Sequence, residues 1–265
     1  MNSRQQPADS RQQIFNRTTN RDIFLSVIIP AYNEEKRIGR TLNAISEYLR
    51  RQPYSYEILV VTDGSTDDTI AVVNENKKSV PNLELLAFSK NRGKGYAVKK
   101  GMLYATGRIR LFMDADNSTN ISHFELMRTF FDKGYEVVIC SRNAKDVKGA
   151  RQSVPQAWHK RLAGNMGNLF IQLVAVRGIW DTQCGFKAFR AGAAEKIFGL
   201  SRINGWGFDV EILALARKSG FKIGIVPADW KNDPLSHIRF SSYLKVLYET
   251  VLTRFNLWRG VYERG

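Results

Sequence analysis

Residues 107–120 read GRIRLFMDADNSTN, and the interpretation of the whole chain starts from this stretch. The apolar run Ile109 to Met113 predicts a β-strand that ends directly before Asp114 and Asp116. Alternate residues at a strand end point to the same side, so the two carboxylates can meet one divalent cation, which prefers oxygen ligands. A three-residue motif also recurs by chance, and two aspartates can simply cap a turn or begin a helix. The surrounding sequence has to distinguish these two interpretations.

Short apolar runs alternate with amphipathic segments between residues 24 and 140. The expected strands are 24–29, 57–61, 83–88, 109–113 and 136–140, and the expected helices are 34–50, 67–76, 94–105 and 122–133. Strands separated by helices of this length imply right-handed crossovers and a mostly parallel sheet, with any site beyond the carboxyl ends of the strands. The sequence therefore predicts an α/β, Rossmann-like fold in which helices flank a mostly parallel sheet.

Three polar motifs follow the first three expected strands. They are PAYNEE at 30–35, TDGSTDD at 62–68 and NRGKG at 91–95. Taken singly, each could consist of turn residues, helix caps or glycines in a loop. Because all three follow successive strands, as Asp114 and Asp116 do, we expect them to form one shared site at one edge of the sheet.

The pattern becomes less regular after residue 141. A basic segment, 142–161, overlaps an expected helix at 158–176, and a loop that carries Asp181 leads to an expected strand at 185–190. A further helix is expected at 209–218. We expect this half of the chain to shape the side of the site that binds a second substrate.

The last expected helix, 240–258, has apolar residues at helical spacing and several basic residues. Arg254 falls on the apolar stripe, where an arginine at a bilayer surface can extend to phosphate headgroups. Docking of the stripe on the protein's own core is the alternative. We divide the chain into a flexible polar tail at 1–22, a globular domain at 23–236 and this amphipathic, membrane-interfacial extension at 237–265. The apolar positions of the stripe are Leu244, Leu247, Tyr248, Val251, Leu252, Phe255 and Trp258.

The composition limits the classes of protein to which the chain can belong. With 265 residues, 43% of them hydrophobic, it can bury a full core. Forty Lys and Arg against 25 Asp and Glu give a formal charge of +15, which favours polyanionic partners such as nucleic acid, phosphorylated substrates or an anionic membrane surface. No zinc pattern or RNA-binding aromatic motif supports nucleic acid, so we expect none to bind. No run approaches the roughly 20 apolar residues of a membrane-spanning helix.

The ordered set of motifs resembles the family 2 inverting glycosyltransferases of the GT-A fold. The matching motifs are VIIPAYNEE, VVTDGSTDDT, NRGKG, MDADNST, Ser141-Arg142 and CGFKAFR. The later elements at 206–211 and 230–234 look most like the dolichyl-phosphate or polyprenyl-phosphate β-glucosyltransferase branch, a relative of the dolichyl-phosphate mannose synthases. Thr62 is a departure, since an acidic residue is usual at this position.

The resemblance implies a role for individual residues. Asp114 and Asp116 would hold Mg²⁺ or Mn²⁺, and Asp181 and Asp116 would be catalytic. Ser141, Arg142, Arg190 and Arg151 would bind the acceptor phosphate, for which the planar guanidinium is suited. Trp158, Phe170 and Leu173 could line an entrance for a prenyl chain, although their helical spacing favours the core. The residues implied to bind the nucleotide sugar are Pro30, Ala31, Tyr32, Glu34, Asp63, Arg92, Lys94, Asp114, Ala115 and Asp116.

The implied reaction is the metal-dependent, inverting transfer of a hexose, with glucose from UDP-glucose favoured, to a polyprenyl (dolichyl-type) monophosphate. The product would be a β-linked lipid-phosphate sugar, formed at the cytoplasmic face of a membrane by a peripherally attached cytoplasmic enzyme. Three alternatives remain open: a mannose synthase that uses GDP-mannose, a family 2 transferase with a hydroxyl acceptor, and a nucleic-acid-binding protein.

Overall fold

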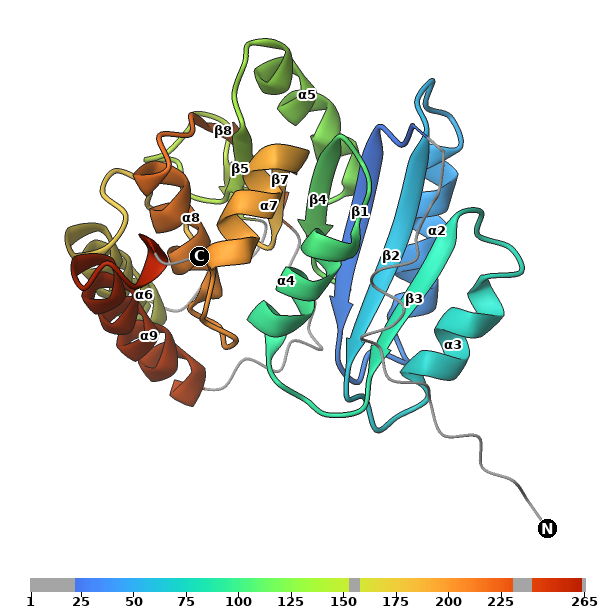
Figure 1. The fold of residues 1–265 in the computed structure, drawn as a ribbon, viewed down its shortest axis with the longest axis horizontal. Helices are drawn as coiled ribbons and strands as arrows, with labels where there is room; N and C mark the ends of the chain where they lie inside the picture. The colour runs from blue at the N-terminus through green and yellow to red at the C-terminus, as the bar shows by residue number, and fades with distance from the viewer. Residues whose placement is uncertain (1–21, 153–157, 231–239, 264–265) are drawn as a thin grey trace.

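The computed structural model describes residues 22–152, 158–230 and 240–263, which form one α/β sheet structure with an additional helical layer (Figure 1). The strands are β1 (Leu25–Ala31), β2 (Tyr56–Asp63), β3 (Leu83–Phe88), β4 (Ile109–Met113), β5 (Val137–Ser141), β6 (Arg151–Gln152), β7 (Phe186–Arg190), β8 (Ile223–Pro227) and β9 (Asp229–Trp230). The α-helices are α2 (Ile38–Leu49), α3 (Thr69–Asn76), α4 (Lys94–Tyr104), α5 (Phe124–Asp132), α6 (Trp158–Val174), α7 (Ala191–Leu200), α8 (Phe208–Lys218) and α9 (Phe240–Trp258). The 3₁₀ turns are η1 (Ile121–His123) and η2 (Val261–Glu263).

Seven strands form the main sheet in the order β3-β2-β1-β4-β7-β5-β8. All neighbouring pairs are parallel except those made by β7, which runs antiparallel to both β4 and β5. The carboxyl ends of six strands therefore share one edge, and β7 begins at that edge instead of ending there. The prediction of a mostly parallel sheet flanked by helices is confirmed; α7, β8 and the direction of β7 were not predicted.

Helices cover both faces of the sheet. One buried cluster combines the strands with α2, α3 and α5, and the other combines them with α4, α7 and α8. Strand β1 serves both clusters because its side chains alternate: Val27 and Ile29 enter the first, and Ile28 enters the second. A strand that is buried on both faces reads as a continuous apolar run, which is why these strands are visible in the sequence.

Helices α6 and α9 lie side by side outside the second layer (Figure 1). Helix α9 docks through Val246, Glu249, Thr250 and Thr253, all of which are buried. The docked face thus differs from the apolar stripe seen in the sequence, most of which is exposed. No helix within the described ranges is both long and apolar enough to cross a bilayer.

Candidate functional site

The loops after β1 and β2 are joined by hydrogen bonds at the carboxyl edge of the sheet. Asn33 has a positive φ of 55°, and its side-chain oxygen accepts from the Thr66 backbone N–H at 2.8 Å. In return the Asn33 N–H donates to the Ser65 hydroxyl at 3.1 Å, and the Glu34 N–H donates to the Thr69 hydroxyl at 2.7 Å. The first two polar motifs therefore form one continuous wall beside Tyr32, which is exposed.

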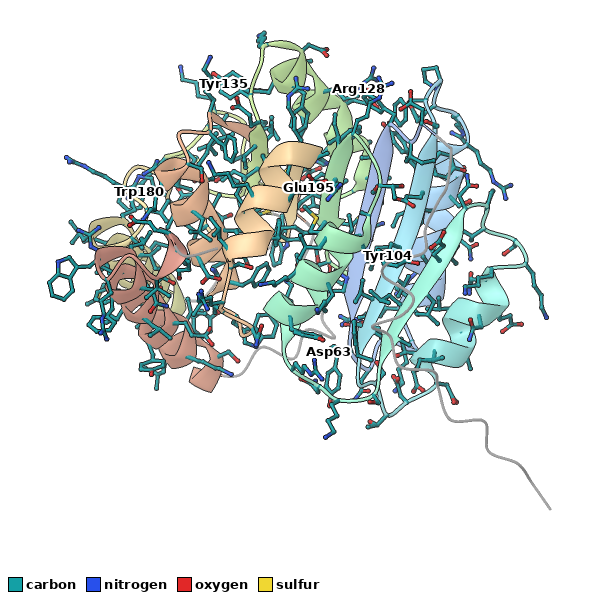
Figure 2. All side chains as sticks on the ribbon, in the orientation of Figure 1. Asp63, Tyr104, Arg128, Tyr135, Trp180 and Glu195 are labelled. Carbon is teal, nitrogen blue, oxygen red and sulfur yellow. The ribbon has the colours of Figure 1, made fainter. Side chains whose placement is uncertain are left out.

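Asp63 connects this wall to the third motif, and Figure 2 shows it at the same edge of the sheet. One carboxylate oxygen accepts from the backbone N–H groups of Arg92 at 2.8 Å and Gly93 at 2.6 Å. The other, Oδ1, is buried and has no hydrogen-bond partner among the described residues. Because a buried acceptor without a partner is costly, Asp63 offers a place for a ligand that carries a donor.

The NRGKG loop presents two cations beside the strand ends. The Arg92 guanidinium lies 4.7 Å from the centre of the Tyr96 ring, and the Lys94 ammonium lies 2.5 Å from Asp114 Oδ1. Gly95 allows this loop to pack closely on the 203–208 segment, since a Cβ there would lie 2.7 Å from the Ile203 carbonyl oxygen. Burial lowers the pKa of Lys94, but the nearby Asp114 and Asp209 carboxylates raise it more, so the ammonium stays charged.

Asp114 lies where the two halves of the chain meet. Its backbone N–H donates to the Gly185 carbonyl at 3.1 Å, directly before β7 begins. A Cβ on Gly185 would lie 2.0 Å from Asp114 Oδ2, so only glycine leaves room for this carboxylate. The loop 114–117 is therefore fixed against the turn that carries Asp181.

Asp116 and Glu34 complete an acidic group around Asp114. Asp116 accepts from the Ser118 N–H at 2.9 Å. Burial, followed by the charge of Asp114, raises the pKa of Asp116. Burial also raises the pKa of Glu34, with Arg37 opposing it and the two aspartates adding to it. Carboxylates that raise one another's pKa are stabilised by a cation between them.

The aspartate pair fits a divalent metal in its chemistry, because both side chains supply hard oxygen donors at a partly exposed strand end. Within the part of the chain that the structure describes, no three His, Cys, Asp or Glu side chains form a complete metal-binding group. A metal held by Asp114 and Asp116 would therefore take its remaining ligands from water or from a bound phosphate.

Asp181, which is buried, forms an ion pair with the half-buried Arg142. The Asp181 carboxylate accepts from Arg142 through the backbone N–H at 2.8 Å, Nε at 2.7 Å and Nη2 at 2.8 Å. Burial raises the pKa of Asp181, but Arg142 lowers it more, so the carboxyl pKa lies below its usual value of 3.8. The Asp181 carboxylate is therefore ionised and suited to orienting the Arg142 guanidinium.

Asp146 holds this pair in place and was missed in the sequence. It accepts from the Ser141 hydroxyl at 2.6 Å and from the backbone N–H groups of Trp180 and Asp181 at 2.7 and 2.9 Å. Ser141 is therefore tied to the turn that carries Asp181. The sequence contains no signal for Asp146, because it lies in an irregular segment between the motifs.

Lys187 and Asp209 form a fully buried ion pair next to the Cys184 carbonyl. The sequence analysis did not predict this pair. The Lys187 ammonium donates to the Asp209 carboxylate and to the Cys184 carbonyl at 2.5 Å. Burial raises the pKa of Asp209, with Lys187 opposing the shift. A lysine in the middle of the apolar strand FKAFR is the signal that could have found it, since buried lysines require a partner.

The assignment of Arg190 to the acceptor site is wrong. Arg190 ends β7 and pairs with Ile109, the first residue of β4, whereas Asp114 follows the end of β4. Because β7 is antiparallel, Arg190 lies at the opposite edge of the sheet, where its Nε donates to the Tyr135 carbonyl at 3.1 Å. Arg151 lies in β6, which pairs with β9, and its side chain is outside the described residues, as is that of Trp158.

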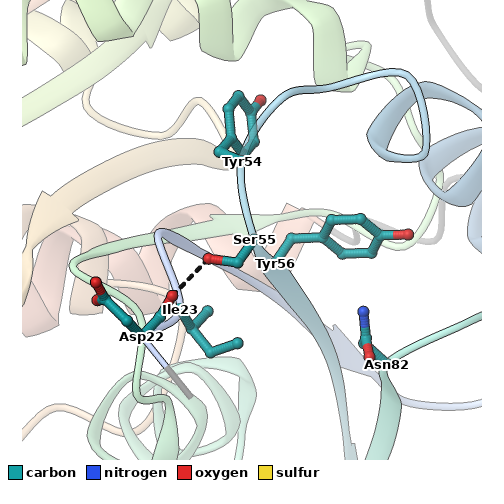
Figure 3. A pocket seen from close by; sticks show the side chains of 6 residues that line it. All are labelled: Asp22, Ile23, Tyr54, Ser55, Tyr56 and Asn82. Carbon is teal, nitrogen blue, oxygen red and sulfur yellow. Dashed lines mark hydrogen bonds between the residues drawn. The ribbon is translucent and has the colours of Figure 1, made fainter.

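The remaining predicted residues lie at the expected edge. Pro30 and Ala31 are buried at the end of β1, and the Ala115 carbonyl accepts from the Thr41 hydroxyl at 2.7 Å. A separate depression lies at the opposite, amino-terminal edge, where the Ser55 hydroxyl donates to the Asp22 carbonyl at 2.6 Å (Figure 3). It holds none of the predicted site residues.

Comparison with known proteins places this chain in a family. Residues 26–198 match the model of glycosyl transferase family 2. A dolichyl-phosphate beta-glucosyltransferase from Trichomonas vaginalis is 34% identical over 250 residues, covering 89% of this chain and 76% of that protein. A dolichyl-phosphate beta-glucosyltransferase from Dictyostelium discoideum is also 34% identical, over 91% of this chain and 77% of that protein.

Solved structures show the same fold. Glucosyl-3-phosphoglycerate synthase from Mycobacterium tuberculosis in complex with UDP aligns with a TM-score of 0.62 at 17% identity, covering 88% of this chain and 79% of the other. Its complex with Mn²⁺, UDP and glucosyl-3-phosphoglycerate gives a TM-score of 0.56 at 20% identity, covering 89% and 79%. The chain belongs to glycosyl transferase family 2 and is a glycosyltransferase of the GT-A fold. The predicted family and branch are confirmed by these relatives.

Proposed function

We propose that this enzyme transfers glucose from UDP-glucose to a dolichyl-type polyprenyl monophosphate, with inversion at the anomeric carbon. The observation that carries the proposal is the contact of Asp114 with Gly185. It sets the donor-side carboxylates beside the turn that carries Asp181, the partner of Arg142. The names of the relatives from Trichomonas and Dictyostelium support the sugar and the acceptor.

The nucleotide lies against the wall formed by the first three polar motifs. Asp63 Oδ1, which is buried and meets no donor in the described part of the chain, accepts from the N–H of the uracil ring. Ala31 and Tyr32 border the base and ribose, and Arg92 and Lys94 lie on the phosphate side. The complex of the mycobacterial synthase with UDP supports a uridine nucleotide on this fold.

The diphosphate lies beside Asp114 and Asp116, which would hold Mg²⁺ or Mn²⁺. When bound, the metal supplies positive charge to the departing nucleoside diphosphate. Lys94 adds a fixed positive charge at the same place, 2.5 Å from Asp114 Oδ1. The presence of Mn²⁺ with UDP in the mycobacterial complex supports the metal assignment.

The acceptor phosphate binds near Arg142 and Ser141. A phosphate monoester has a second pKa of about 6, so it is already a dianion in part at neutral pH and requires no strong base. Asp181 orients Arg142 through three hydrogen bonds, and a carboxylate engaged in this way is poorly placed to act as the base that a hydroxyl acceptor would need. Arg151 remains a proposed contributor to phosphate binding.

We place the enzyme peripherally at the cytoplasmic face of a membrane. A polyprenyl phosphate holds its phosphate at the bilayer surface, whereas a nucleotide sugar is in the aqueous phase. The two substrates can meet only where a water-exposed site lies against the lipid headgroups.

The test is an assay of the purified protein with MgCl₂ or MnCl₂, a short polyprenyl phosphate and a panel of UDP-glucose, GDP-mannose and UDP-N-acetylglucosamine. Mass spectrometry should detect a glycolipid only with UDP-glucose. The matched polyprenyl alcohol should give no product, and Asp116→Ala should abolish transfer, whereas Asp132→Ala, at an exposed aspartate, should not. Transfer to the alcohol, or from GDP-mannose alone, would refute the proposal.

A further inference from the structure

The exposed large apolar side chains of this protein gather on two neighbouring helices. Within the described residues, ten of the thirteen exposed large hydrophobic side chains belong to α6 and α9. Trp258 and Leu173 are 80% and 79% exposed. The two helices lie side by side (Figure 1). We call this surface the α6–α9 face; its members are Met166, Leu169, Phe170, Leu173, Tyr243, Leu244, Tyr248, Val251, Phe255 and Trp258.

The outward orientation of α9 is fixed by its opposite, polar face. Glu249 is buried and accepts from the Gly207 backbone N–H at 2.6 Å. Gly205 permits this contact, since a Cβ there would lie 2.2 Å from Glu249 Oε1. The hydroxyls of Thr250 and Thr253 donate to backbone carbonyls of the same helix, so they are satisfied without water. Rotating the apolar stripe inward would separate Glu249 from the Gly207 N–H, so this contact keeps the stripe outside.

Apart from the buried Glu249, the charged residues of α6 and α9 are all basic, and the nearest acidic residue after α9 is Glu263, which pairs with Lys218. Residues 151–178 contain no Asp or Glu, and residues 240–260 contain only Glu249, which is buried. The exposed charges of α9 and its end are therefore all basic, namely Lys245, Arg254 and Arg259. Arg254 lies within the apolar stripe, and Arg259 lies 5.3 Å from the centre of the Phe255 ring.

An apolar face on two helices whose exposed charges are basic is complementary to an anionic lipid surface, where aliphatic and aromatic groups enter the headgroup boundary and Lys or Arg reach phosphates. A second copy of the chain is a poorer partner, because both copies would bring basic residues and a net charge of +15 to the contact. An exposed apolar patch of this kind marks an interaction site.

We propose that the α6–α9 face docks on an anionic bilayer, with both helices lying in the plane of the interface. This inference rests on the proposed function in one respect, that the acceptor is a lipid in the membrane. The surface also has a physical connection to the site: Glu249 holds the 205–207 turn, and Trp206 in that turn lies 5.4 Å from the Lys94 ammonium. Docking would therefore hold the site at the membrane surface.

The experiment is sedimentation of the full chain with sucrose-loaded vesicles of phosphatidylcholine alone and of phosphatidylcholine with phosphatidylglycerol. The double variant Met166→Ser/Trp258→Ser changes one exposed apolar residue on each helix and should lose at least about tenfold in affinity for the anionic vesicles, because binding scales with buried apolar area. The matched control Leu103→Ser/Leu126→Ser changes exposed leucines on α4 and α5 and should bind as the unaltered chain does. Circular dichroism checks that both variants are folded.

The possible outcomes distinguish a failure of the proposed docking surface from a failure of the proposed reaction. Equal sedimentation of both double variants would overturn the surface, as would failure of the unaltered chain to bind vesicles. A lipid-free dimer that the α6–α9 substitutions dissociate, without vesicle binding, would identify a second copy as the occupant and also overturn it. Transfer to a short, water-soluble acceptor should be unchanged in Met166→Ser/Trp258→Ser, since neither residue has been assigned to the site. Vesicle binding by a chain that shows no transfer would leave the docking surface supported while the proposed reaction fails.

Discussion

Gly185 supports Asp114 so closely that a single added methyl group should disable the site. In Gly185→Ala the new Cβ would lie 2.0 Å from Asp114 Oδ2, whereas ordinary contacts of a Cβ begin at 3.4 Å. The carboxylate must therefore move by about 1 Å or more. Asp114 is 34% exposed, so it can turn toward solvent without unfolding the chain. Gly185 has an ordinary backbone conformation, so the effect comes from the contact and not from strain in φ.

The expected magnitude follows from that displacement. A misplacement of about 1 Å in a catalytic constellation reduces the rate by roughly 100-fold, so kcat/KM for the nucleotide sugar should fall by at least about that factor. Overpacking costs about 1–3 kcal/mol, so the melting temperature should fall by only about 2–10 °C. Isothermal titration calorimetry should show a parallel loss of affinity for UDP in the presence of Mn²⁺.

Gly192→Ala is the matched control, because a Cβ at Gly192 meets nothing within 4 Å. It lies in the first turn of α7 and should keep full activity and equal or slightly higher stability. If Gly185→Ala were as active as Gly192→Ala and bound UDP and Mn²⁺ equally well, the placement of Asp114 beside Gly185 would not matter for function. The reasoning that joins the two sides of the site would then be refuted.

Substitutions at three further places test the buried charges. Lys187→Met leaves Asp209 buried without its partner and should lower the free energy of unfolding by about 3–5 kcal/mol in urea titrations. The double variant Lys187→Met/Asp209→Leu should recover part of this loss. An unchanged unfolding midpoint in Lys187→Met would contradict the buried ion pair. The folded-state pKa of Asp181 is lowered, because Arg142 outweighs burial, so its stabilisation is present above about pH 4 and is lost as pH falls below that. The difference in unfolding free energy between the unaltered chain and Asp181→Asn should therefore be constant near neutral pH and shrink toward pH 3; a difference that grows on acidification would reverse this sign. Glu249→Ala should cost about 2–3 kcal/mol, whereas Glu249→Gln, which keeps an acceptor oxygen, should cost less than half of that by the same titration.

Much of the fold and part of the site follow from the sequence. Strands β1, β2, β4 and β5 are buried along their whole length, so each contains an apolar run that needs no tertiary information to be recognised. In a parallel sheet every strand ends at the same edge, so the residues that follow the first four strands had to meet there. This reasoning placed Asp63, Lys94, Asp114 and Asp116 together, and the structure describes them at that edge.

The tertiary structure alone decided the direction of β7, the partners of the buried charges and the face that α9 exposes. The pattern FKAFR is the same for a parallel and an antiparallel strand, so the sequence could not show that Arg190 lies at the far edge. Asp146 meets the backbone of Trp180, and Asp209 meets Lys187; both partners are distant in the chain, and the neighbouring sequence of each aspartate gives no sign of them. The spacing of apolar residues predicts which residues share one face of a helix. Whether that face is buried depends on how the helix docks on the rest of the protein. In α9 the contact of Glu249 with Gly207 settled this, and it left Trp258 exposed to solvent.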